Sequence, residues 1–172
     1  MHQLSPAFKR PTSWTTAVTV RSKNDPQRKV ADDSVVSTCR PSILVVDDDQ
    51  SAARMLRDAL DVWGYDVILA CNGLEGLYLL DGQVVEGILL DIQMPVMDGP
   101  TMLDELRWLG YQTPVVVMSG DLNGSTLRQL AQEGAQGFMI KPFSLPALHK
   151  LCVTIFENHG ADFSPDHHSY LV

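Results

Sequence analysis

Five polar residues stand where short apolar runs end, and their types suit phosphoryl chemistry beside a metal ion. Asp47 and Asp48 follow one run, Asp91 ends the second, and Ser119 and Lys141 follow the third and fourth. The apolar runs are residues 43–46, 88–90, 115–118 and 138–140. If these runs are parallel strands, their carboxyl ends meet at one edge of a sheet, where ligands bind in open α/β folds. We therefore expect one acidic site that contains a single amine and a single hydroxyl.

The acidic residues of this predicted site require a counter-charge. Two unit charges about 4 Å apart repel by roughly 4 kcal/mol at an effective dielectric near 20, so Asp47, Asp48 and Asp91 together favour a bound cation. Mg²⁺ is the natural candidate because it takes oxygen ligands from one or two carboxylates and fills its other positions with water and phosphate oxygens. The alternative is a solvated acidic turn, and Asp49 is expected to cap the helix that follows it.

Asp91 is the predicted nucleophile. It opens the segment DIQMPVMDG, in which Pro95 and Gly99 predict a tight, irregular loop. A carboxylate fixed beside a metal can attack a phosphoryl group in line and form an acyl phosphate. Asp98, directly before Gly99, is interpreted as a turn residue with a structural role.

Ser119 and Lys141 complete the predicted site. The Ser119 hydroxyl can donate a hydrogen bond to a phosphoryl oxygen, and Gly120 leaves room for a phosphate. Lys141 comes at the end of an apolar strand, where an ammonium group needs a partner, and Asp91 is the predicted one. Taken alone, Ser119 and Lys141 are each also compatible with an ordinary turn or loop.

Apolar strands alternate with helical stretches five times from Ile43 onward, a pattern typical of an α/β fold with a parallel sheet. The predicted helices are about 51–63, 74–80, 100–109, 122–132 and 145–158. Residues 1–40 contain three prolines and no sustained periodicity, which predicts a mostly disordered arm. The globular domain is therefore expected at residues 41–159, followed by a short tail at 160–172.

Composition and charge limit the possible partners. Of the 172 residues, 45% are hydrophobic, which is enough for one ordinary core. Residues 1–40 carry seven basic and three acidic residues, whereas residues 41–159 carry six and sixteen, so nucleic-acid binding by the globular domain is not expected. No run of eighteen apolar residues occurs, so no membrane association is expected. Three widely separated cysteines favour a reducing, cytoplasmic location.

Four segments fit one family in their order and spacing: ILVVDDD (43–49), LLDIQMPVMDG (89–99), VVVMSG (115–120) and GFMIKPF (137–143). Together they resemble the receiver domain of two-component response regulators, over roughly residues 42–159. The resemblance implies a flavodoxin-like (βα)5 doubly wound parallel sheet with strand order 2-1-3-4-5. It also implies that Asp91 is the phosphoacceptor.

The same resemblance implies a role for each residue of the site. Asp48, Asp91 and the backbone carbonyl of Gln93 would bind Mg²⁺, and Asp47 would order metal-bound water. Ser119 and Lys141 would contact the phosphoryl group, with the Lys141–Pro142 peptide bond in the cis form.

Switching and lifetime residues follow from the resemblance as well. Phe138 falls on the position of the family's switch aromatic and would move together with Ser119, although a static core phenylalanine is the alternative. Gln93 and Asp121 lie two residues beyond the acceptor and the hydroxyl, respectively. They would affect how readily water hydrolyses the acyl phosphate, with no direction predicted.

The expected function is a phosphorylation-dependent signalling switch that catalyses only its own phosphorylation and dephosphorylation. A histidine kinase or phosphotransfer protein would phosphorylate Asp91, and the face formed by residues 122–132, 136–140 and 145–158 would then change its preference for an unidentified protein partner. Only a tail follows the last helix, so a stand-alone receiver is expected. One alternative is a phosphorylation-independent adaptor on the same scaffold. An aspartate-nucleophile phosphatase is less favoured, because Gln93 occupies the usual place of its second carboxylate.

Overall fold

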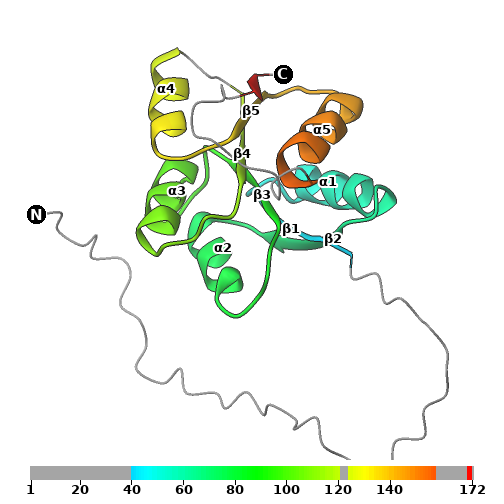
Figure 1. Ribbon diagram of the computed structural model, residues 1–172, viewed down its shortest axis with the longest axis horizontal. Helices are drawn as coiled ribbons and strands as arrows, with labels where there is room; N and C mark the ends of the chain where they lie inside the picture. Colours follow the sequence, from blue (N-terminus) through cyan, green and yellow to red (C-terminus); the bar gives the residue numbers. More distant parts are fainter. Residues whose placement is uncertain (1–39, 121–123, 158–169, 172) are drawn as a thin grey trace, which may run out of the picture. The chain divides into compact units, whose positions relative to one another are not determined.

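One parallel sheet forms the centre of the fold. The computed structural model describes residues 40–120, 124–157 and 170–171. The strands in these residues are β1 Ser42–Val46, β2 Asp66–Ala70, β3 Gly87–Asp91, β4 Val115–Ser119, β5 Gly137–Ile140 and β6 Tyr170–Leu171. They pair in the order β2-β1-β3-β4-β5-β6, all in parallel (Figure 1). The predicted order 2-1-3-4-5 is confirmed for the first five strands, while β6 extends the sheet with a strand that was not predicted.

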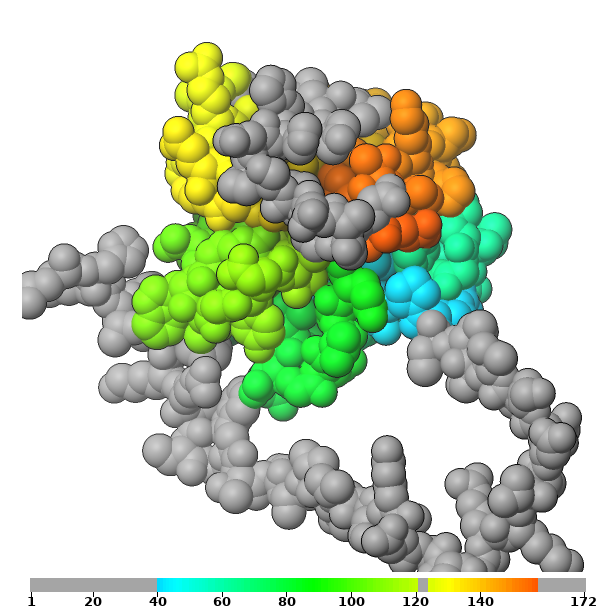
Figure 2. Space-filling model, in the orientation of Figure 1, coloured from blue at the N-terminus to red at the C-terminus, as the bar shows by residue number. Residues whose placement is uncertain are grey.

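Helices connect the strands and cover both faces of the sheet. They are α1 Gln50–Val62, α2 Gly73–Leu80, α3 Gly99–Trp108, α4 Gly124–Gln132 and α5 Leu145–Cys152. The helices α2, α3 and α4 lie on one face and α1 and α5 on the other (Figure 1). In the space-filling view, α4, α3 and α2 follow one another along one side of the molecule (Figure 2).

The last helix differs from its prediction. A single α-helix was expected to about residue 158, but α5 ends at Cys152 and the chain continues as a π-helix, η1 Val153–Glu157. Ile155 and Phe156 in η1 are still buried against the sheet, so the apolar pattern that predicted the longer helix is present. The wider π-helical turn changes the hydrogen bonding of this segment without removing its packing.

Alternating side chains along the central strands supply a core on each face. In β1, Leu44 and Val46 pack into the cluster beneath α2 and α3, whereas Ile43 and Val45 pack into the cluster beneath α1 and α5. Successive side chains of a strand point to opposite faces, and a parallel strand covered on both sides must be apolar on both. This explains why the run at residues 43–46 is continuous rather than alternating.

Local signals set the ends of the helices. The Asp49 side chain caps α1 by accepting hydrogen bonds from the amides of Ser51 and Ala52, at 2.8 and 3.3 Å, which confirms its predicted role. The helix stops where Gly64 adopts a φ of +94°, a conformation that glycine tolerates best. Among the described helices, none is long and apolar enough to cross a bilayer. Residues 1–39 of the arm predicted at 1–40, and Asp121, lie outside the described residues.

Candidate functional site

The sheet brings the predicted site residues to one edge. Asp47 follows β1, Asp91 ends β3, Ser119 ends β4 and Lys141 follows β5. The strand register aligns Val46 with Leu90, Asp91 with Met118, and Ser119 with Ile140, so the four strands end at nearly the same level. Parallel pairing alone therefore gathers side chains that are far apart in the sequence.

Lys141 bridges two buried carboxylates. Its Nζ donates to Oδ2 of Asp47 at 2.7 Å and to Oδ1 of Asp91 at 2.6 Å. Asp47 and Asp91 are 2% and 7% exposed, and the lysine side chain is 28% exposed. Sequence reasoning predicted the pairing with Asp91 but missed the pairing with Asp47. The signal that could have revealed it is the excess of acidic residues over a single amine at one strand edge.

Backbone amides hold the second oxygen of each carboxylate. The amide of Asp49 donates to Oδ1 of Asp47, and the amide of Gln93 donates to Oδ2 of Asp91, both at 2.9 Å. In each case the donor lies two residues after the aspartate, so the loop that leaves the strand turns back onto the carboxylate. Both acids are thereby fixed in orientation before any ligand binds.

The electrostatics of the site are unbalanced toward negative charge. Burial raises the pKa of Asp91, and the nearby Asp47 carboxylate adds to this rise, against the lowering effect of Lys141 and the Gln93 amide. Burial alone would lower the pKa of Lys141, but its hydrogen bonds to Asp47 and Asp91 leave the pKa raised. Lys141 therefore remains an ammonium group, and one such charge does not fully compensate the acidic residues around it.

A third carboxylate completes an oxygen-rich cluster. Carboxylate oxygens of Asp47, Asp48 and Asp91 all lie within 4.8 Å of one another, and Asp48 is exposed. An all-oxygen donor set with an open side suits Mg²⁺, which keeps several of its waters when it binds to proteins. The residues present thus fit a hard divalent cation.

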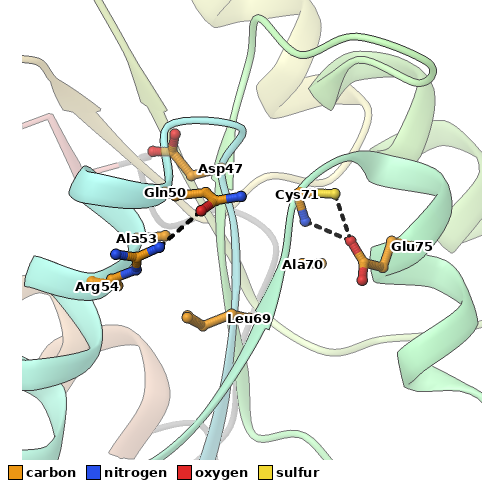
Figure 3. Close-up of a pocket in the computed structure, with 8 residues that line it drawn as sticks. All are labelled: Asp47, Gln50, Ala53, Arg54, Leu69, Ala70, Cys71 and Glu75. Atoms are coloured by element: carbon orange, nitrogen blue, oxygen red, sulfur yellow. Dashed lines mark hydrogen bonds between the residues drawn. The ribbon is translucent and has the colours of Figure 1, made fainter.

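A hollow of about 320 Å³ lies beside the cluster. It is lined by Asp47, Gln50, Ala53, Arg54, Leu69, Ala70, Cys71 and Glu75 (Figure 3). Both the thiol and the amide of Cys71 donate to Oε2 of Glu75 at 2.8 Å, which ties the end of β2 to the first turn of α2. The bond to Glu75 raises the pKa of the Cys71 thiol, so it is not activated as a nucleophile. No sequence signal pointed to this pair.

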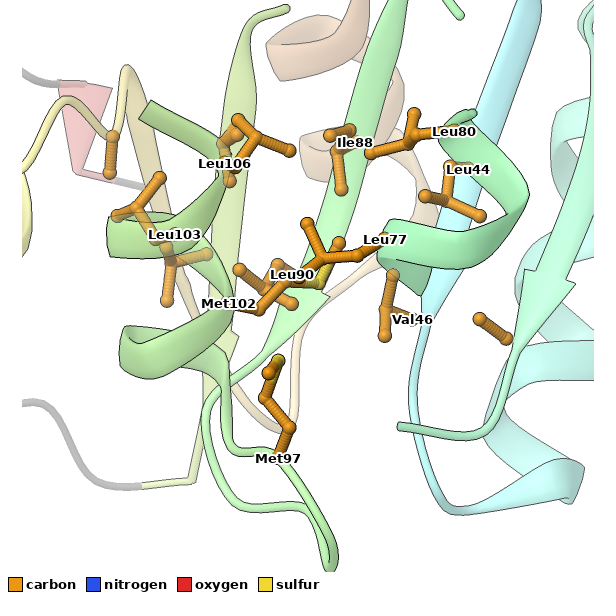
Figure 4. Close-up of a cluster of buried hydrophobic side chains, with 14 of the residues drawn as sticks. Leu44, Val46, Leu77, Leu80, Ile88, Leu90, Met97, Met102, Leu103 and Leu106 are labelled. Atoms are coloured by element: carbon orange, nitrogen blue, oxygen red, sulfur yellow. The ribbon is translucent and has the colours of Figure 1, made fainter. Parts of the chain in front are cut away.

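The loop between β3 and α3 is held tightly against the strand end. A Cβ atom at Gly99 would clash with the carbonyl oxygen of Asp91, so only glycine permits this approach. Met97 is buried in the core cluster with Leu90 and Met102 and so anchors the loop to the core (Figure 4). Asp98 caps α3 by accepting from the amide of Thr101 at 2.9 Å, which confirms its structural interpretation.

One residue of this loop is strained. Val96 has a φ of +69°, a left-handed conformation that is costly for a β-branched residue. It lies five residues after Asp91 and is 79% exposed, so no apolar burial of its own side chain offsets the strain.

Ser119 and Phe138 are both buried. Ser119 is 3% exposed, and its carbonyl accepts a hydrogen bond from the amide of Lys141 at 2.7 Å. Phe138 is 1% exposed and belongs to the core cluster on the side of α3 and α4. The Lys141–Pro142 bond is cis, as the resemblance implied, and the Gln93 side chain is exposed.

The fold is that of a receiver domain. Residues 43–152 match the family model described as the response regulator receiver domain, and the chain belongs to this family. The resemblance proposed from the four sequence segments is therefore confirmed.

The chain is similar to curated regulators that are longer than the matched region. It is 38% identical over 106 residues to transcriptional regulatory protein ZraR of Klebsiella oxytoca, covering 62% of this chain and 24% of that protein. It is 33% identical over 124 residues to response regulator MprA of Mycobacterium sp. (strain KMS), covering 72% and 54%. The chain thus spans between a quarter and about half of the length of these relatives.

Solved structures with the same fold are matched almost completely. Chemotaxis protein CheY4 of Vibrio cholerae superposes with a TM-score of 0.65 at 28% identity, covering 68% of this chain and 99% of that one. The receiver domain of Francisella response regulator 1452 gives a TM-score of 0.64 at 29% identity, covering 69% and 98%. These matches confirm the flavodoxin-like (βα)5 fold.

Proposed function

We propose that this protein is a phosphorylation-dependent switch that accepts a phosphoryl group on Asp91. The observation that carries the proposal is the Lys141 ammonium, which bridges Asp47 and Asp91 at 2.7 and 2.6 Å inside a cluster of three carboxylates. A buried, oriented carboxylate beside a fixed cation suits attack on phosphorus, because positioning and charge neutralisation dominate the catalysis of phosphoryl transfer. A histidine kinase or a phosphotransfer protein would be the donor.

The transfer itself is a single displacement. An oxygen of Asp91 forms a bond to phosphorus while the phosphorus–nitrogen bond of a phosphohistidine breaks, and the electron pair leaves with the imidazole nitrogen, which takes a proton from water. Lys141 pairs with a phosphoryl oxygen, and the Ser119 hydroxyl donates to another. Gln93 and Asp121 would govern the access of water that later hydrolyses the acyl phosphate.

Mg²⁺ fits the donor set described above. Asp48, Asp91 and the backbone carbonyl of Gln93 would hold the ion, and Asp47 would order its bound water. When bound, Mg²⁺ neutralises charge that develops on the phosphoryl oxygens.

Phosphorylation would change the surface of the domain through Ser119 and Phe138. The new phosphoryl group attracts the Ser119 hydroxyl, and the shift vacates space that Phe138 can enter. Phe138 lies on β5 and packs on the side of α4, so the face formed by α4, β5 and α5 would change its preferred protein partner. The protein is accordingly a regulator that turns over only its own phosphoryl group.

Incubation of the full chain with Mg²⁺ and acetyl phosphate, followed by intact-mass measurement, tests the proposal. We expect one phosphoryl adduct on the wild type and none on Asp91→Asn. Asp98→Asn is the matched control, because it removes an acid from the same loop while asparagine keeps the cap of α3. Absence of the adduct from the wild type, or an undiminished adduct on Asp91→Asn, would reject Asp91 as the acceptor.

A further inference from the structure

The outer edge of β5 carries a strand from the far end of the chain. In β6, Tyr170 pairs with Gly137 and Leu171 with Phe138, in parallel register (Figure 1). Without β6, β5 would be an edge strand of the sheet. An edge strand presents unpaired N–H and C=O groups that can pair with another extended segment.

The direction of the backbone amides identifies the group that β6 covers. The amide of Lys141 donates to the carbonyl of Ser119 at 2.7 Å, on the β4 side of β5. Amide directions alternate along a strand, so Met139 also points toward β4, and Phe138 points toward the opposite edge, where β6 lies. The Phe138 amide is therefore the donor that this edge offers within the paired stretch.

The length of the chain allows this strand to be supplied by the same molecule. Residues 158–169, twelve in number, separate η1 from β6. A crossover between parallel strands needs about a dozen residues or more, and twelve extended residues reach roughly 40 Å. The match to the receiver-domain family spans residues 43–152, so β6 lies outside it. The strand is thus an addition to the matched region.

We propose that the edge of β5 is a strand-addition site whose occupant is the chain's own C-terminal strand, held weakly and reversibly in solution. Strand addition recognises a partner mainly through its main chain, and two paired residues make a weak, displaceable occupant. The covered edge belongs to the face of α4, β5 and α5, so the tail restricts access to that face. This inference goes beyond phosphorylation of Asp91 and does not require it.

Hydrogen exchange resolved by residue tests the site in the unphosphorylated protein. We compare the full chain with a chain that ends at residue 159, which retains every element from β1 to η1. Removal of the tail is expected to speed exchange of the Phe138 amide by about tenfold, while Met139, which points toward β4, stays unchanged. Equal Phe138 exchange in the two chains would overturn the proposal, and it would do so whether or not Asp91 accepts phosphate.

Two further measurements separate the possible occupants. In the full chain, Tyr170→Pro removes a backbone donor from β6 and should reproduce the effect of truncation, whereas Ala161→Pro in the same tail should not. A synthetic peptide of residues 160–172 added to the truncated chain should restore Phe138 protection in proportion to its occupancy. Protection that rises with protein concentration in the full chain would place the strand on a second copy and overturn the intramolecular assignment.

Discussion

The carboxyl and amino ends of the parallel sheet differ in how their charged side chains are paired. At the carboxyl end, Asp47 and Asp91 share the single ammonium of Lys141, and Asp48 adds further negative charge. At the amino end, the half-buried Arg107 donates to the backbone carbonyls of Tyr111, Thr113 and Gly134 at 3.0, 3.0 and 2.7 Å. These carbonyls belong to loops that enter β4 and β5, so one guanidinium joins α3 to both loops.

A second contact at the amino end follows the same principle. The Tyr65 hydroxyl donates to Oε1 of Glu157 at 2.5 Å, and Arg40 donates to the carbonyl of Tyr65 at 2.7 Å. The first bond connects the start of β2 to the end of η1, and the second connects the start of β2 to the segment before β1. The amino end therefore pairs its polar groups for stability, whereas the carboxyl end keeps excess charge and the strained Val96. Such a division is expected when a site must stay reactive.

Loss of Arg107 should have the largest effect on stability. Arg107→Met keeps much of the apolar stem but leaves three carbonyls without their donor, so we expect the free energy of unfolding to fall by about 3 kcal/mol in urea denaturation. Arg57→Met is the control, because Arg57 is exposed and, within the described part of the chain, its side chain donates only to the adjacent Asp58. Equal losses in the two variants would show that the bonds of Arg107 contribute nothing specific.

Mg²⁺ should compensate the excess negative charge at the carboxyl end of the sheet and thereby stabilise the folded protein. At a hundredfold excess over its dissociation constant, a ligand that binds only the folded state stabilises it by about 2.7 kcal/mol. We expect thermal unfolding of the wild type to show this gain and Asp48→Asn to lose it. Without Mg²⁺, Asp48→Asn should be slightly more stable than the wild type, since a repulsive charge is removed.

Asp104→Asn is the matched control for the Mg²⁺ experiment. Asp104 is an exposed acid on α3, outside the cluster, so its loss should leave the Mg²⁺ response intact. A response of Asp48→Asn equal to that of Asp104→Asn would remove Asp48 from the proposed ligands.

Deprotonation of Tyr65, at the amino end of the sheet, should destabilise the folded protein at alkaline pH. Burial, with the hydrogen bond and charge of Glu157, raises the pKa of Tyr65 above its ordinary value of 10.0. The folded protein then keeps this proton at a pH where the unfolded chain loses it, so stability falls as the pH rises above about 10. Tyr65→Phe should cost about 1 kcal/mol at pH 7 and flatten the alkaline decline. Urea denaturation at a series of pH values checks this, and an alkaline decline that is as steep in Tyr65→Phe as in the wild type would contradict it.

The sequence predicted those features that repeat over several residues. Continuous apolar runs predicted β1, β3 and β4, and parallel pairing then required Asp91 and Lys141 to meet, because their strands end at the same edge. Glycines after the helices predicted where they stop, as at Gly64 and Gly110. The (βα)5 order followed from the alternation of the elements together with the family resemblance.

Features that depend on single tertiary contacts could not be predicted. β6 contains two residues, which is too short for any periodic signal. The π-helix η1 keeps the apolar spacing of an ordinary α-helix, so the sequence pattern does not distinguish the two. Phe156 fits in η1 because Gly87 on β3 has no side chain to clash with its ring. The pairing of Asp47 with Lys141 likewise depends on which neighbouring carboxylate the long side chain reaches.

The strain at Val96 provides the smallest test of the difference between the two ends. A left-handed backbone costs an L-residue about 1–2 kcal/mol, and glycine avoids this at an entropic cost of roughly 0.5–1 kcal/mol. Val96→Gly should therefore stabilise the protein by about 0.5 kcal/mol or slightly more in urea denaturation. Val84 is equally exposed, at 82% against 79%, and has no positive φ, so Val84→Gly should destabilise by a similar amount. Opposite signs would locate stored strain in the loop beside Asp91, whereas two losses would show that the loop holds none.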